Sequence, residues 1–148
     1  MKRVIILLLL ALFLVGCKPK ESAVVPVTLP TVPANCVEAT AGISERYEQN
    51  KAYKCGESTI GLTLMAKEEY ATAEMDSFLN LTKDYAPKEG EIILEKETKE
   101  CKGRRYFYMV SRSNETEKPA IFLQEGRLLV TISGEADKIA KEMKLLCK

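Results

Sequence analysis

The sequence contains neither histidine nor tryptophan. Histidine is the commonest general base in enzymes, so its absence excludes every Ser-His and Cys-His nucleophilic arrangement. The eight glycines all stand singly, so the chain has no glycine-rich phosphate-binding loop. Lys and Arg number 22 against 21 Asp and Glu, which leaves almost no basic surplus for binding nucleic acid. The composition therefore favours a non-catalytic protein that needs no cofactor and binds no nucleic acid.

What the sequence does contain is a short apolar stretch at its N-terminus. Lys2 and Arg3 supply positive charge, and residues 4–15 are all apolar. A helix needs about 20 apolar residues to cross a bilayer, so this run is short for a membrane span. Positive charge followed by a short apolar run predicts an export signal over residues 1–16.

The signal ends in Leu14-Val15-Gly16-Cys17. This tetrapeptide resembles the lipobox of prokaryotic lipoproteins, in which Leu, a small or apolar residue, and Gly or Ala precede a cysteine. The resemblance implies that Cys17 receives a diacylglyceryl group, that the signal is cut before it, and that the protein stays membrane-anchored on the extracytoplasmic side. Two or more acyl chains anchor firmly, because each buried methylene contributes about 0.8 kcal/mol. An uncleaved anchor and a plain secreted protein are the alternatives.

Proline dominates the stretch that follows the lipidated cysteine. Residues 17–35 hold four of the six prolines of the chain and show no helical or alternating pattern. Such spacing favours extended polyproline II structure, so we expect a tether between the anchor and a folded domain. The alternative is a docking motif, because Pro30 and Pro33 form a minimal PxxP core.

The remaining residues, 36–148, have the length of a single domain and contain four cysteines. An exported domain permits disulfides, so two are expected among Cys36, Cys55, Cys101 and Cys147, with three pairings open from the spacing. Metal and redox sites usually need a C-x-x-C spacing, which is absent. We therefore expect structural disulfides and no metal.

Periodicity in this domain predicts an α+β fold. Strands are expected over 59–65, 91–98, 104–112, 120–124 and 127–133, and residues 38–53 are ambiguous, with a short helix from Ser44. One amphipathic helix follows the first strand and ends at Ala86-Pro87, and a second runs from Ala136 to Cys147. We expect a four- to five-stranded antiparallel meander with the helices packed on one face.

This topology selects one disulfide pairing. In a meander the turns at 101–103 and 125–126 lie at the same end of the sheet, since one up-and-down pair of strands separates them. The terminal helix then returns alongside strand 127–133 towards that end. Cys101 should therefore pair with Cys147, which leaves Cys36 for Cys55.

One constellation suggests a binding face. Arg104, Tyr106, Tyr108 and Arg112 alternate onto one side of strand 104–112. Tyrosine rings and guanidinium groups are frequent in recognition surfaces for glycans, peptides and acidic partners. The alternative is an ordinary uncovered sheet face, in which tyrosine serves strand propensity and cross-strand packing.

These inferences combine into a membrane-anchored cell-envelope lipoprotein with a non-catalytic binding or accessory domain, whose partner is an envelope protein or a glycan. A structural or assembly role with another envelope protein is the first alternative. An envelope hydrolase is the second, for which Glu68-Glu69 and the pair Glu97 and Glu100 are the nearest carboxylate groupings. Asn80 and Asn114 lie in N-glycosylation acceptor patterns, which matter only in a host that uses them.

Overall fold

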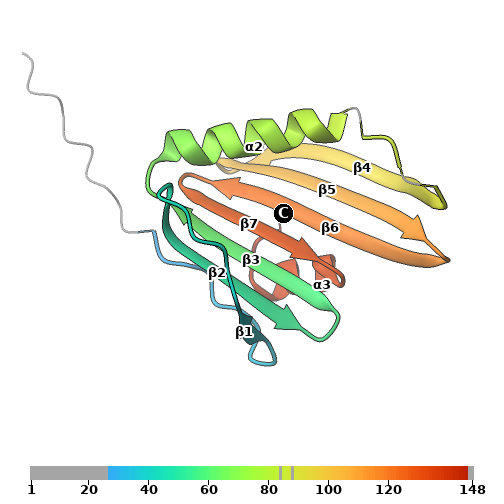
Figure 1. The fold of residues 1–148 in the computed structure, drawn as a ribbon, viewed down its shortest axis with the longest axis horizontal. Helices are drawn as coiled ribbons and strands as arrows, with labels where there is room; N and C mark the ends of the chain where they lie inside the picture. Colours follow the sequence, from blue (N-terminus) through green and yellow to red (C-terminus); the bar gives the residue numbers. More distant parts are fainter. Residues whose placement is uncertain (1–26, 84, 88, 147–148) are drawn as a thin grey trace, which may run out of the picture.

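The computed structural model describes residues 27–83, 85–87 and 89–146 (Figure 1). They form one seven-stranded antiparallel sheet and two helices, with strand order β1-β2-β3-β7-β6-β5-β4. The α+β class and the antiparallel meander are confirmed, but the sheet is larger than the four to five strands expected. The elements are β1 Val37–Ala39, β2 Tyr47–Cys55, β3 Ser58–Met65, α2 Glu68–Lys83, β4 Glu91–Cys101, β5 Arg104–Ser113, β6 Thr116–Glu125, β7 Leu128–Ser133 and α3 Ala136–Glu142.

The additional strands come from the region whose sequence was ambiguous. The prediction of a short helix from Ser44 is wrong, because residues 47–55 form β2 and pair with β3 in a hairpin. Its turn is Gly56-Glu57, where Gly56 adopts a φ of 66° that glycine reaches without steric cost. Asn50 is fixed on β2 by Thr63 of β3, whose hydroxyl donates to the amide oxygen at 2.9 Å. Cross-strand pairing thus overrides the weak helical signal.

The connection between the expected strands 104–112 and 120–124 is a tight turn and not a loop of seven residues. Only Asn114 and Glu115 connect β5 to β6, with φ values of 50° and 64°. Pro119 therefore lies inside β6, although proline removes a hydrogen-bond donor from a sheet. It is tolerated because β7 has ended beside it: the N–H of Gly134, just after β7, donates to the Pro119 carbonyl at 3.1 Å.

The two helices cover opposite faces of the sheet, which corrects the expectation that both pack on one face (Figure 1). α2 packs with Phe107, Phe122 and Leu129, whereas α3 packs with Leu123 and Val130. Neighbouring residues of a strand point to opposite sides, so a run such as Phe122-Leu123 places apolar side chains on both faces. Each face then requires its own cover.

α3 is shorter than the helix expected from residues 136 to 147. It ends at Glu142, and Lys144 then adopts a positive φ of 57°. A guanidinium nitrogen of Arg104 donates to the carbonyl oxygens of Lys144 and Leu145, at 3.4 and 3.5 Å. The chain after α3 consequently reaches the β4–β5 turn, as the meander topology predicts.

One disulfide joins described residues, Cys36 to Cys55, and it agrees with the predicted pairing. Cys101 is also disulfide-bonded. Its predicted partner, Cys147, lies outside the described residues, as does the lipobox cysteine Cys17. The Cys101–Cys147 pair stays a prediction, and the position of Arg104 beside Leu145 favours it.

The expected tether, residues 17–35, overlaps the folded domain. Val27, Leu29 and Val32 are partly buried against the core on the α3 face, and the Cys36 disulfide follows them. Spaced apolar side chains let an extended segment without its own hydrogen bonds pack on a surface. Packing on the core therefore begins before Cys36, and the part of the predicted tether before Val27 lies outside the described residues.

Candidate binding groove beside helix α2

The predicted arginine and tyrosine face lies on the same side of the sheet as α3. Tyr106 is only 6 % exposed and belongs to the core beneath that helix. Tyr108 is half-buried, and its hydroxyl donates to the Asp137 carboxylate of α3 at 2.9 Å. Burial, followed by the Asp137 charge, raises the pKa of Tyr106 to about 12. Burial and the Asp137 hydrogen bond raise the pKa of Tyr108 to about 12 as well, so both phenols are neutral donors at ordinary pH.

The two arginines of this face lie apart and have partners within the chain. Arg104 forms an ion pair with Glu125 at 2.9 Å, besides its bonds to the end of the α3 region. Arg112, at the other end of β5, pairs with Glu117 of β6 at 2.5 Å. The structure therefore uses these four side chains largely to join β5 to its neighbours.

The carboxylates of the hydrolase alternative do not converge. Glu68 and Glu69 lie in the first turn of α2. On β4, Glu97 pairs with Lys99 at 2.7 Å, and Glu100 lies 4.0 Å from Arg105. In the described part of the chain, no cluster of three acidic, cysteine or histidine residues is suited to hold a metal.

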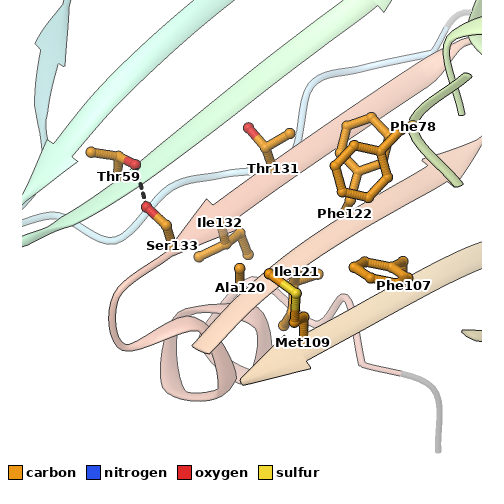
Figure 2. A pocket seen from close by; sticks show the side chains of 10 residues that line it. All are labelled: Thr59, Phe78, Phe107, Met109, Ala120, Ile121, Phe122, Thr131, Ile132 and Ser133. Carbon is orange, nitrogen blue, oxygen red and sulfur yellow. Dashed lines mark hydrogen bonds between the residues drawn. The ribbon is translucent and has the colours of Figure 1, made fainter. Parts of the chain in front are cut away.

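A different site is formed on the α2 face, which the helix covers only in part. Beyond Phe78 the sheet is left open as an apolar groove of about 200 Å³ (Figure 2). Side chains from β3, β5, β6 and β7 make its floor, and α2 makes one wall. It is lined by Thr59, Phe78, Phe107, Met109, Ala120, Ile121, Phe122, Thr131, Ile132 and Ser133.

Phe78 is a fixed wall of the groove. Its ring centroid lies 5.2 Å from that of Phe107 with the planes at 80°, an edge-to-face contact. It lies 4.2 Å from the Phe122 centroid in a tilted arrangement. Aromatic pairs at these separations add attraction beyond the area they bury. The helix therefore presents a rigid aromatic surface to whatever enters.

Small residues keep the groove open. Ala120 lies opposite Met109 on β5 and opposite Ser133 on β7, so no large side chain fills the centre. Gly61 lies opposite Thr131, and a Cβ on Gly61 would lie 2.4 Å from the Thr131 hydroxyl. Thr59 and Ser133 share a 2.6 Å hydrogen bond at the far end (Figure 2). An apolar floor thus meets a hydroxyl-lined rim.

This groove is not predicted from the sequence. Strand alternation places Phe107 and Met109 on the side of β5 away from the tyrosines, but it attaches no function to that side. The usable signal is the alternation of small and large residues across paired strands, such as Ala120 beside Met109. That signal needs the cross-strand register, which the chain alone does not display.

No protein-family model matches the sequence, and no curated protein shows significant similarity to it. Among the described residues, no helix has the length and apolarity needed to span a membrane. Function is therefore inferred from the groove, the charges and the N-terminal sequence.

Proposed function

We propose that the chain is a membrane-anchored cell-envelope lipoprotein whose folded domain is a non-catalytic binding module for another envelope protein. The attachment rests on the signal and on the lipobox at Cys17. The binding role rests on the apolar groove beside α2. Its partner contributes one large apolar side chain, which enters between Phe78 and the open sheet.

The size of the groove supports a protein partner over a small molecule. Small-molecule sites usually have volumes of about 300–1,000 Å³ and enclose most of the ligand. At about 200 Å³ the groove is smaller, but it suits a single aromatic or aliphatic anchor of the kind that dominates protein interfaces. The hydroxyls of Thr59 and Ser133 lie at its rim, where a polar border is expected.

A glycan partner has less support. The glycan hypothesis rests on the predicted arginine and tyrosine face of β5. There the polar groups of Tyr108 and Arg112 already bond to Asp137 and Glu117. A purely structural role does not require the groove, so a groove-specific experiment separates it from the binding role.

The test places a photoreactive aromatic residue at Thr59, on the groove rim, in the full chain within its native envelope. The control position is Lys141, exposed on α3 and therefore on the opposite face. We expect one dominant protein adduct from position 59 and none of the same mass from position 141. Adducts shared by both positions would contradict a groove partner.

A second pair of variants ties the adduct to the groove. Ala120→Leu fills the floor, and it should lower the yield of the position-59 adduct at least about tenfold, as expected for loss of a central anchor. Ala73→Leu makes the same change on the exposed side of α2 and should leave the yield unaltered. Equal yields in both variants, in chains with the wild-type circular dichroism spectrum, would refute the proposed function.

A further inference from the structure

The two edges of the sheet differ in length. At one edge β1 has only three residues, whereas β4 at the other has eleven. β4 pairs with β5 alone, and no further strand of the described chain covers its outer side (Figure 1). An open edge presents a row of backbone donors and acceptors that can pair with another strand.

The hairpin geometry identifies which residues present those groups. Cys101 and Arg104 flank the two-residue turn Lys102-Gly103 and are register partners. In a two-residue hairpin the flanking pair exchanges hydrogen bonds, and bonding then alternates along the strand. Backbone groups of Lys96, Thr98 and Glu100 consequently point away from β5, towards solvent.

The side chains of this edge are complementary to a second copy of themselves. When two β4 strands run antiparallel with Thr98 opposite Thr98, Glu97 faces Lys99 and Lys96 faces Glu100. Both pairs occur twice because of the two-fold axis. Opposite charges directly across a strand pair are favourable and like charges are unfavourable. This register therefore contains four oppositely charged pairs and no like-charged pair between residues 96 and 100.

The neighbouring registers are less complementary. Backbone hydrogen bonding allows only those registers in which an outward-pointing residue of one copy faces an outward-pointing residue of the other. The register can therefore change only in steps that preserve this pairing. The adjacent arrangement on one side sets Glu97 against Glu97, beside two Lys99–Glu95 pairs. The one on the other side sets Lys99 against Lys99 and also Lys96 against Lys102. Charges on edge strands commonly prevent pairing altogether. Here their order favours the Thr98 register, which has the most oppositely charged pairs and no like-charged pair between residues 96 and 100.

We propose that β4 is a homodimerisation edge, at which two copies of this chain pair antiparallel about a two-fold axis through Thr98. The axis makes the contact closed, so association stops at two copies rather than continuing into fibres. Glu97 would exchange its present partner Lys99, at 2.7 Å in the same chain, for Lys99 of the second copy. The inference is independent of the groove, which lies on other strands.

The test uses charge reversal in the full chain in detergent, with mass measured by sedimentation. The Lys96→Glu/Lys99→Glu variant makes the edge uniformly acidic, and Glu97→Lys/Glu100→Lys makes it uniformly basic. We expect wild-type dimers, monomers for each variant alone, and dimers again when the two variants are mixed. The quadruple variant restores complementarity and should also dimerise. Lys138→Glu/Lys141→Glu, an equal charge change on α3, should behave as wild type.

Lys96 also donates to the carbonyl oxygens of Thr82 and Lys83 at the end of α2, so its replacement perturbs more than the edge. Thr98→Cys avoids this problem. Hydrogen-bonded antiparallel pairs have Cα atoms about 5.5 Å apart, which a disulfide can span. Mild oxidation should link two Thr98→Cys chains, and should not link Lys141→Cys chains. A monomeric wild type, failure of the mixture to dimerise, or equal linkage at both positions would each overturn the proposal.

Discussion

At the scale of single residues, the most informative groups are two tyrosines that stabilise the packing of α3 on the sheet. Tyr108 donates to Asp137 at 2.9 Å and thereby joins the middle of β5 to α3. Tyr106 lies deeper, within the core on the same face. Removing either phenol from water while placing it near a carboxylate disfavours the phenolate. The folded state therefore favours the protonated form of both hydroxyls.

This preference predicts a loss of stability at high pH. The folded pKa of Tyr108 is about 12, against about 10 in an unfolded chain. Below pH 10 both states keep the proton and the stabilisation is complete. Between pH 10 and 12 the unfolded state loses its proton first, so the free energy of unfolding falls as the pH rises. Tyr108→Phe should make this fall shallower, by up to about 1.4 kcal/mol per pH unit, in urea unfolding series.

Asp137→Asn provides the complementary variant. It retains a hydrogen-bond acceptor but removes the charge, so the late part of the tyrosinate absorbance titration should move to lower pH. A pH slope identical in wild type and Tyr108→Phe would show that this phenol does not ionise differently in the two states.

The start of α3 is decided by a contact between two elements. The Ser58 hydroxyl, buried at the head of β3, accepts a hydrogen bond from the Glu135 N–H at 2.9 Å. Gly134 adopts a φ of 92°, and a Cβ there would lie 2.8 Å from the Ser58 Cα. Both the backbone angle and the close approach require glycine at this position.

A pair of glycine substitutions separates these two requirements. Gly103, in the β4–β5 turn, has a similar φ of 77°, but a Cβ added there would meet nothing within 4 Å. Gly103→Ala should cost about 1 kcal/mol from the left-handed backbone alone. Gly134→Ala adds overpacking against Ser58 and should cost about 2–4 kcal/mol in total. Chemical denaturation measures both, and equal losses would mean that Ser58 moves aside without cost.

The elements that the sequence predicts well are those whose patterns are local. β3 alternates clearly, and α2 carries an apolar stripe, although it ends at Lys83 rather than at the predicted Ala86-Pro87. The turns at 101–103 and 124–126 were also placed correctly, whereas the one between β5 and β6 is shorter than predicted. β2 was missed because its residues, only half-buried, mix charged and apolar side chains without a clear alternation. The placement of α2 and α3 on opposite faces was missed for another reason. Runs such as Phe122-Leu123 are apolar on both sides, and periodicity does not say which helix covers which side.

At the scale of the whole molecule, the candidate site combines segments distant in the chain. Phe78 comes from α2, Thr59 from β3, and Ala120 and Ser133 from β6 and β7. No local motif contains them, which is why the sequence pattern points to the Tyr106 and Tyr108 side of β5 instead. Alternation places those residues on one face correctly, but it does not reveal that α3 returns over that face. Which side chains of a strand become buried depends on the complete topology, including the helices that cover each face.

The proposed attachment of the molecule depends on one atom, the sulfur of Cys17. Cys17→Ser keeps the apolar signal but removes the acceptor for the diacylglyceryl group, so it should move the protein from the membrane to the soluble fraction or stop its processing. Cys36→Ser also removes one cysteine sulfur, in this case that of the Cys36–Cys55 disulfide, but it leaves the lipobox intact and should remain in the membrane fraction. Intact-mass analysis of the membrane-bound wild type should find an acylated N-terminus at Cys17. Unchanged membrane retention of Cys17→Ser, or a mass that includes Met1, would refute the lipobox assignment and leave an uncleaved anchor as its explanation.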